Sequence, residues 1–171
     1  MKSFTNVDKK TKNLIKEIRL IAFDFDGVFT DNKVFVFQDG TEAIACYRGD
    51  GIGLNKLKEM NIHIRIISSE VNQVVLKRAE KLNVDAINNV SDKKSELVKI
   101  IEKLKITKDQ VAFVGNDIND LNCMKFVGLP ITVNDAHPDV LNQALYKTSN
   151  NGGAGAVREI CDLFENVNKG Q

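Results

Sequence analysis

The stretch Leu20-Ile21-Ala22-Phe23-Asp24-Phe25-Asp26-Gly27 places two carboxylates directly after four apolar residues. Four consecutive apolar residues are typical of a strand buried on both faces of a sheet. Open parallel sheets bind ligands beyond the carboxyl ends of their strands, and two acids one residue apart need a shared positive charge to stay ionised. Mg²⁺ takes carboxylate and carbonyl oxygens and shares them with phosphate. The stretch therefore predicts a buried strand that ends at a magnesium and phosphate site, although Asp-Gly alone is an ordinary turn signal.

Strand-like and helix-like patterns alternate along the rest of the chain. Apolar, β-rich runs occupy residues 20–23, 62–67, 84–87, 111–114 and 129–133. Helical patterns occupy residues 53–60, 71–82, 91–104, 121–126 and 154–164, and a polar helical extension lies within residues 1–18. Such alternation requires crossover connections and a parallel sheet. We therefore expect an α/β fold with a single doubly wound parallel sheet in one domain, residues 1–171, whose tail and last helix span 152–171.

Composition narrows the classes of partner. The chain has 171 residues, and 24 Lys and Arg nearly balance 23 Asp and Glu, so no general basic field favours nucleic acid or an anionic membrane. No apolar run is long enough to span a bilayer. Cys46, Cys123 and Cys161 are scattered and odd in number, which argues against a disulfide framework and a zinc site. These features favour a cytoplasmic protein that binds a small molecule.

Residues 33–47 break the alternating pattern. Two β-rich segments, 34–37 and 42–47, flank Gln38-Asp39-Gly40-Thr41, which is typical of a β-hairpin with an Asp-Gly turn. The segments carry more apolar side chains than a monomer leaves in water, namely Val34, Phe35, Val36, Phe37, Ile44 and Tyr47. We expect the hairpin to project beside the acid pair and to mediate self-association.

Polar residues follow the other predicted strands at the same edge of the sheet. Ser68 follows the second strand, Lys93 lies in the first turn of a later helix, and Gly115-Asn116-Asp117-Ile118-Asn119-Asp120 follows the fourth strand. Together with the acid pair, these residues suit phosphoryl transfer: a carboxylate attacks phosphorus, an acid protonates the leaving alcohol, and a hydroxyl and an ammonium hold the phosphoryl oxygens. Lys94 could replace Lys93 if the loop is shifted by one residue.

These motifs resemble those of the haloacid dehalogenase phosphatases. The resemblance covers nearly the whole chain, and its motifs are Asp24-Phe25-Asp26-Gly27-Val28 with Thr30-Asp31, then Ile66-Ile67-Ser68, Ser91-Asp92-Lys93, Gly115-Asn116-Asp117-Ile118-Asn119-Asp120 and Gly152-Gly153-Ala154-Gly155-Ala156-Val157-Arg158-Glu159. The most similar branch is small and lacks a cap domain. It contains 3-deoxy-manno-octulosonate 8-phosphate phosphatases, nonulosonate 9-phosphate phosphatases and the C-terminal domain of animal CMP-sialate synthetases. Spacing agrees, because only about thirty residues separate the acid pair from the strand at Ile62, too few for a cap domain.

The resemblance implies roles for individual residues. Asp24 would be the nucleophile and a Mg²⁺ ligand, and Asp26 the acid/base that binds the metal through its main-chain carbonyl. Ser68 and Lys93 would stabilise the transferring phosphoryl group, and Asn116 or Asp117 would complete the metal site. By position, the expected substrate contacts are Arg48, Asp50, Gly51 and Arg78. The family also implies a homotetramer joined through the hairpins, in which a neighbour's tail helps to cover the site.

The chain departs from the octulosonate phosphatases at several positions. Asn116 stands where that group has a metal-binding acid, which puts metal affinity in doubt. Glu70, Gly49 and Ala154 stand where that group has arginines, which weakens the case for that acidic sugar. Animal CMP-sialate synthetase domains have a similar Gly-Asn-acid sequence.

Three functions remain open from the sequence. The first is a Mg²⁺-dependent phosphatase of a 2-keto-3-deoxy sugar acid phosphate, octulosonate or sialic-acid-like. The second is a weakly active or inactive tetramerisation module that serves a sugar-acid cytidylyltransferase, which Asn116 favours. The third is a phospho-accepting receiver domain, but receivers place the accepting Asp after the third strand, whereas this acid pair follows the first. The intact set Asp24, Asp26, Ser68 and Lys93 favours the phosphatase.

Overall fold

A sheet of parallel strands forms the centre of the computed structural model, which describes residues 7–170. Its strands, in the spatial order β5-β4-β1-β6-β7-β8, are β1 (Leu20–Phe23), β4 (His63–Ile67), β5 (Asp85–Ile87), β6 (Val111–Gly115), β7 (Leu129–Thr132) and β8 (Tyr146–Lys147). All neighbours in this order pair in parallel. The predicted doubly wound sheet is confirmed. The short strand β8 was missed because it has no apolar run of its own.

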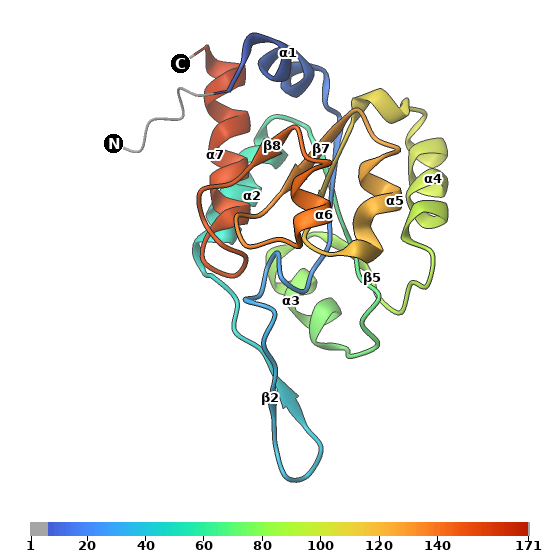
Figure 1. Ribbon diagram of the computed structural model, residues 1–171, viewed down its shortest axis with the longest axis vertical. Helices are drawn as coiled ribbons and strands as arrows, with labels where there is room; N and C mark the ends of the chain where they lie inside the picture. Colours follow the sequence, from blue (N-terminus) through green and yellow to red (C-terminus); the bar gives the residue numbers. More distant parts are fainter. Residues whose placement is uncertain (1–6, 171) are drawn as a thin grey trace.

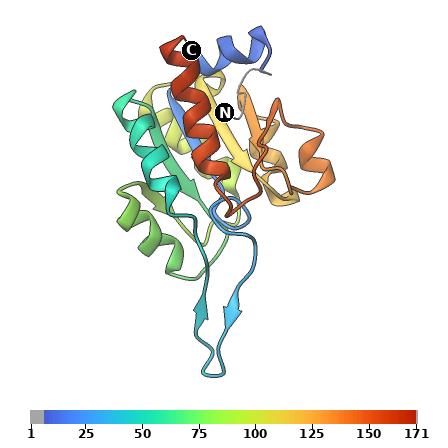
Figure 2. The same ribbon diagram turned by 90° about the vertical axis from the view of Figure 1, so that its left-hand side faces the viewer.

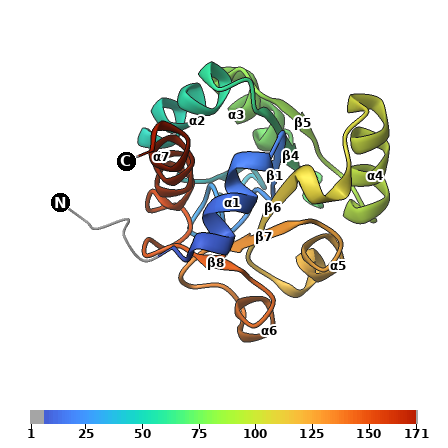
Figure 3. The ribbon, with the colours of Figure 1, turned by 90° about the horizontal axis from the view of Figure 1, so that it is seen from above.

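Helices cover both faces of this sheet. They are α1 (Lys9–Glu17), α2 (Gly49–Glu59), α3 (Val74–Leu82), α4 (Lys93–Leu104), α5 (Leu121–Met124), α6 (Pro138–Leu141) and α7 (Ala156–Lys169), with 3₁₀ turns η1 (Lys108–Gln110) and η2 (Ile118–Asp120). Helices α2, α3 and α7 lie on one face, and α4 and α5 lie on the other (Figure 3). All four residues of β1 are buried, as expected for a central strand covered on both faces. No helix in residues 7–170 is long and apolar enough to cross a membrane.

Helix α3 begins later in the sequence than predicted, because the side chains of Glu70 and Asn72 bind the main chain of the segment that leads into it. The sequence pattern predicts a helix from residue 71, but α3 begins at Val74. Glu70 Oε1 accepts hydrogen bonds from the main-chain N–H groups of Val71 (2.7 Å) and Asn72 (2.9 Å), and Asn72 Oδ1 accepts one from Val74 (3.0 Å). Such local bonds compete with helical ones. The segment after Ser68 is therefore a fixed loop beside the sheet edge.

The predicted hairpin projects from the end of the molecule at which the parallel strands finish (Figures 1 and 2). Its paired strands, β2 (Phe35–Val36) and β3 (Glu42–Ala43), are shorter than predicted, and one further bridge joins Thr30 to Cys46. Between β1 and β4 the described chain forms only this hairpin and α2, so it has no cap domain. The hairpin tip stands clear of the rest of the described chain (Figure 2).

Candidate active site

Three neighbouring strands bring the predicted residues to one edge of the sheet. Asp24 follows β1, Ser68 follows β4 and Asn116 follows β6. The register pairs Phe23 with Ile66 on one side and with Val114 on the other, so the three strands end at the same level. Side chains about ninety residues apart in sequence therefore meet at the carboxyl ends of the strands, where open α/β sheets bind ligands.

A buried lysine joins two buried acids at this edge. The Nζ atom of Lys93 lies 2.7 Å from Oδ1 of Asp24 and 2.8 Å from Oδ1 of Asp120. Lys93 begins α4, and Asp92 caps that helix by accepting a hydrogen bond from the main-chain N–H of Ser95 (3.1 Å). Lys94 instead lies with its Nζ atom 5.3 Å from the centre of the Phe126 ring. The alternative that Lys94 replaces Lys93 is therefore wrong.

The electrostatics of this cluster call for a further positive charge. Burial, together with the charge of Asp120, raises the pKa of Asp24 to about 7, although Lys93 opposes the shift. Burial disfavours the charge on Lys93, but Asp24 and Asp120 outweigh it and raise the pKa of the ammonium. One ammonium between two carboxylates leaves a net negative charge. A divalent cation beside Asp24 would keep its carboxylate ionised at neutral pH.

Asp26 borders a hollow that reaches Asp24. The hollow has a volume of about 290 Å³ and is lined by Asp24, Asp26, Asn32, Asn116, Asp117, Ile118 and Asn119. Burial and the nearby charge of Glu70 raise the pKa of Asp26 above its ordinary value. Asp26 thus keeps a proton to higher pH than an exposed aspartate does, which suits a general acid.

The donor set at the hollow fits a magnesium ion. The terminal atom of the Asn116 amide that points toward the two acids lies 2.9 Å from the main-chain oxygen of Asp26 and 3.3 Å from Oδ2 of Asp24. Neighbouring ligands of an octahedral Mg²⁺ lie about 3 Å apart, because each bond is about 2.1 Å long. In residues 7–170 no three His, Cys, Asp or Glu side chains come together as a metal cluster. The oxygen atoms that converge at this hollow come instead from one carboxylate, one main-chain carbonyl and one side-chain amide.

Asp117 also lines the hollow, but its side chain has a structural partner. Its Oδ1 accepts a hydrogen bond from the main-chain N–H of Ile118 (2.7 Å) and caps η2. Asn116 is therefore a better candidate than Asp117 for the metal ligand, because its amide faces the oxygen atoms of Asp24 and Asp26.

Ser68 is buried at the end of β4. Its hydroxyl oxygen accepts a hydrogen bond from the main-chain N–H of Glu70 (3.0 Å), which fixes the oxygen while the hydroxyl proton can be donated. A phosphoryl oxygen would be its acceptor.

The predicted substrate contacts lie apart from the acids, at the base of the hairpin. Arg48 is exposed beside the start of α2, and Gly51 packs within α2 against Leu82. Asp50 is buried, and its Oδ1 accepts a hydrogen bond from the main-chain N–H of Arg158 in α7 (3.1 Å). Arg78 donates from Nη2 to the main-chain oxygen of Tyr47 (3.1 Å). None of the four lines the hollows beside Asp26.

A second hollow next to Asp26 has room for a leaving group. It measures about 230 Å³ and lies between the hairpin and the loop after Ser68, lined by Asp26, Asn32, Lys33, Val34, Glu42, Ile44, Glu70, Asn72 and Val74. Asn72 Nδ2 donates to Glu42 Oε2 (3.0 Å) and so ties the loop to the hairpin. Polar groups predominate, which suits the hydroxyls of a sugar.

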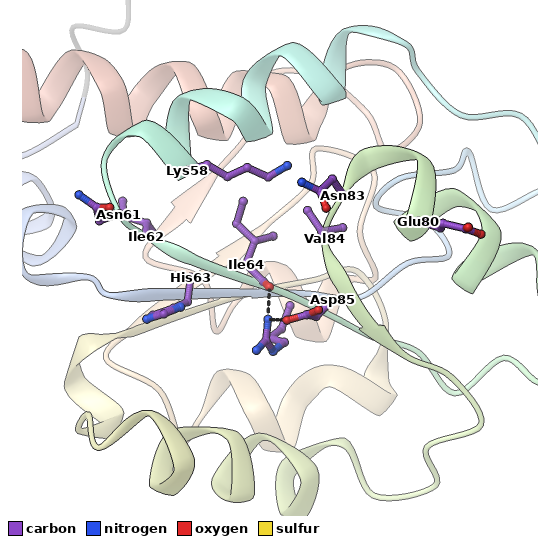
Figure 4. A pocket seen from close by; sticks show the side chains of 10 residues that line it. Lys58, Asn61, Ile62, His63, Ile64, Glu80, Asn83, Val84 and Asp85 are labelled. Atoms are coloured by element: carbon purple, nitrogen blue, oxygen red, sulfur yellow. Dashed lines mark hydrogen bonds and ion pairs between the residues drawn. The ribbon is translucent and has the colours of Figure 1, made fainter.

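A wider hollow of about 650 Å³ lies where β4 begins, at the opposite end of the strands (Figure 4). Its lining includes Lys58, His63 and Asn83, and Arg65 there pairs with Asp85. None of the predicted catalytic residues lines it, whereas Asp24 and Asp26 line the smaller hollows.

Asp120 is the site residue to which sequence reasoning gave no role. It is fully buried and accepts hydrogen bonds from Lys93 Nζ and from the main-chain N–H groups of Asn116 (2.9 Å) and Asp117 (3.3 Å). One carboxylate thus holds the Lys93 ammonium and the loop after β6 in place. The sequence feature that could have indicated Asp120 is an acid five residues after Gly115. In the structure these two residues are in close contact, because a Cβ added at Gly115 would lie 2.5 Å from the Cβ atom of Asp120.

Comparisons with known proteins point to one kind of enzyme. A family model described as haloacid dehalogenase-like hydrolase matches residues 52–160. The chain is 38% identical over 161 residues to the 3-deoxy-D-manno-octulosonate 8-phosphate phosphatase of Salmonella typhi, an alignment that covers 94% of this chain and 84% of that protein. The crystal structure of the phosphatase of the same name from Yersinia pestis superposes with a TM-score of 0.91 at 33% identity, covering 94% of this chain and 88% of that one. The Moraxella catarrhalis phosphatase, crystallised with magnesium ion, phosphate ion and a KDO molecule, gives 0.89 at 33% identity, covering 92% and 91%.

Proposed function

The chain belongs to the haloacid dehalogenase-like hydrolases and is a phosphatase, and we propose that it hydrolyses a 2-keto-3-deoxy sugar acid phosphate. The candidate substrates are 3-deoxy-manno-octulosonate 8-phosphate and sialic-acid-like nonulosonate 9-phosphates. The observation that carries the proposal is the buried pair of Asp24 and Lys93 beside Asp26, at a hollow large enough for a phosphoryl group. Family membership excludes the receiver-domain alternative.

The proposed reaction has two steps. Asp24 attacks phosphorus and forms an aspartyl-phosphate, while protonated Asp26 gives its proton to the leaving alkoxide. Asp26 then takes a proton from a water molecule that attacks phosphorus, which releases orthophosphate and restores Asp24. Lys93 and the Ser68 hydroxyl hold the phosphoryl oxygens throughout.

Mg²⁺ is the proposed cofactor, held by Asp24, the main-chain oxygen of Asp26 and Asn116. When bound, it would offset the negative charge of the carboxylates and the phosphoryl group. The relative crystallised with magnesium and phosphate supports this assignment.

The charged side chains that line the second hollow, next to Asp26, affect which sugar could bind there. Glu42 and Glu70 can accept hydrogen bonds from sugar hydroxyls, whereas Lys33 is the one cation among residues 7–170 that lines this hollow. Lys33 is highly exposed and already pairs with Asp31, so it holds a substrate carboxylate weakly. A cation from a neighbouring subunit, such as the exposed Arg48, would complete the recognition of a sugar acid.

The exposed apolar side chains of the hairpin are the reason to propose a neighbouring subunit. Phe35 and Val36 are 62% and 66% exposed and alternate between its two faces, so association through both faces would bury them. We propose a homotetramer. The three cysteines are free, which suits a reducing compartment and supports a cytoplasmic location.

Phosphate release from a panel of esters tests the proposed function. Purified protein with Mg²⁺ is given octulosonate 8-phosphate, sialate 9-phosphates and simple sugar phosphates, with Asp24→Asn as the control. Preferred release from one sugar acid phosphate supports the proposal and identifies the substrate. Preferred release from neutral sugar phosphates contradicts the proposed substrate class, and negligible release from all of them favours the tetramerisation module.

A further inference from the structure

The side-chain amide of Asn116 can either donate a hydrogen bond to the neighbouring acids or present an oxygen to a metal ion, and the two roles need opposite orientations of the amide. In one orientation its nitrogen donates to the main-chain oxygen of Asp26 (2.9 Å) and to Oδ2 of Asp24 (3.3 Å). The amide oxygen then faces hydrogen-bond donors on its other side, so both ends are satisfied. A half-turn about the Cβ–Cγ bond places the oxygen toward the two acids, where a bound cation makes three converging oxygens favourable.

We infer that Asn116 closes the metal-free site with its amide nitrogen and turns its amide to present oxygen when Mg²⁺ binds. The part of this inference that concerns Mg²⁺ rests on the proposed function, whereas the closure of the metal-free site does not. An ionised aspartate at this position could perform only the second role, because a carboxylate has no proton to donate. An aspartate at position 116 would therefore gain metal affinity and lose stability without metal, relative to the asparagine present here.

Hydrogen bonds from neighbouring residues fix the main chain of Asn116 but not the orientation of its side-chain amide. The main-chain N–H of Asn116 donates to Asp120 Oδ2 (2.9 Å), and its main-chain oxygen accepts from the N–H of His137 (2.8 Å). A Cβ added at Gly27 would lie 2.0 Å from the amide, so only glycine leaves room for it there, and the φ angle of +76° at Gly27 also favours glycine. A turn of the amide thus lets Asn116 switch partners while its main-chain hydrogen bonds stay in place.

Charge makes the exchange asymmetric. In the metal-free protein, an aspartate at position 116 would add a third carboxylate to Asp24 and Asp120, with only Lys93 to balance them. That charge repels in the absence of metal and attracts Mg²⁺ when it is present.

Four proteins test the inference at equal concentration: wild type, Asn116→Asp, Asn116→Ala and the control Asn119→Asp. Asn119 is exposed at the rim of the same hollow, so its substitution adds the same charge without touching the amide contacts. Thermal unfolding is followed in EDTA, and Mg²⁺ affinity is measured by calorimetry without substrate.

The two substitutions at Asn116 are expected to agree in EDTA and to differ with Mg²⁺. In EDTA both lower the unfolding midpoint, by about 4 °C or more, because two hydrogen bonds are lost. With Mg²⁺, Asn116→Asp binds about ten-fold more tightly than wild type and Asn116→Ala about ten-fold more weakly, since affinity follows ligand charge and number. Asn119→Asp changes the midpoint and the affinity much less.

Three results would overturn the inference. Unchanged midpoints for both Asn116 variants in EDTA would show that the amide does not close the metal-free site. Equal loss of Mg²⁺ affinity in both would show a purely structural asparagine. Equal tightening in Asn116→Asp and Asn119→Asp would show general attraction in place of ligation. If no variant binds Mg²⁺, the proposed cofactor fails, and the midpoints in EDTA still decide the closure. If Asn116→Asp does not fold without metal, Asn116→Ala alone decides it.

Discussion

The catalytic edge and the hairpin differ in how far one chain completes them. At the catalytic edge, Asp24, Lys93 and Asp120 are 4%, 4% and 0% exposed, and each has charged or hydrogen-bonding partners within the chain. On the hairpin, Phe35 and Val36 are more than 60% exposed and have no cover from the described chain. The difference teaches that one chain provides every partner of these buried charges, whereas the hairpin leaves apolar side chains that only another molecule could cover. This contrast underlies the proposed division between phosphoryl transfer in one chain and sugar recognition by further subunits.

Removal of the proposed nucleophile, Asp24, should have the largest effect. Asp24→Asn is expected to lower phosphate release by a factor of about 10⁴ or more, because an amide does not attack phosphorus. Circular dichroism should show the fold retained, since the substitution removes an acid that burial already disfavours. Turnover near the wild-type rate would show that another group attacks phosphorus.

Asp120 should rank next, as a positioning residue. Asp120→Asn leaves Lys93 with one carboxylate partner and weakens the bonds that hold the loop after β6, so kcat is expected to fall by roughly 10- to 100-fold. The pH at which Lys93 loses its proton should also fall, because Asp120 helps to raise its pKa. The upper limb of the pH–rate profile measures this shift. Exposed Asp109→Asn is the control, and equal profiles for both variants would remove the role.

Changes in the hairpin should affect assembly and selection more than chemistry. The double variant Phe35→Ser, Val36→Ser is expected to sediment as a smaller species and to raise KM for the sugar acid phosphate by about ten-fold. Its hydrolysis of a small aryl phosphate should change by less than about three-fold, since catalysis needs no neighbour. Gln38→Ala in the same hairpin serves as the control. Equal loss with both substrates would show that the catalytic edge is also incomplete in one chain.

The smallest effect is expected at Asp50, where the two regions join. Burial raises the pKa of Asp50 to about 7, and its Oδ2 has no hydrogen-bond partner among the described residues. The folded state thus binds a proton that the unfolded state releases, so this group makes wild type less stable as pH rises through the interval up to about 7. Asp50→Asn cannot ionise, and its unfolding midpoint should gain on wild type between about pH 5 and about pH 8. A constant difference across that range would contradict the burial of a charge there.

The sequence predicted the sheet better than the connections. The apolar runs located five strands because central strands buried on both faces need consecutive apolar residues. The start of α3 depended on side-chain bonds from Glu70 and Asn72 that compete with a helix and carry no periodic signal. The strand β8 pairs through two residues only, which no pattern distinguishes from a loop.

The candidate site was predictable where the chemistry requires particular residue types. Asp24 and Lys93 were predicted, and the structure joins them in an ion pair. Asp120 received no role, because its partners come from a helix distant in sequence and from main-chain N–H groups. The roles of Arg48 and Arg78 stay predictions, since neither side chain lines the hollows beside Asp26.

Chemical trapping of the aspartyl-phosphate tests the central claim most directly. The protein is mixed with its best ester and Mg²⁺, quenched during turnover, and treated with borohydride, which reduces an acyl phosphate to an alcohol. Peptide mass spectrometry should then find homoserine at position 24, and no such change at Asp26 or Asp120. Rapid phosphate release with Asp24 unmodified, or modification of a different acid, would contradict the account.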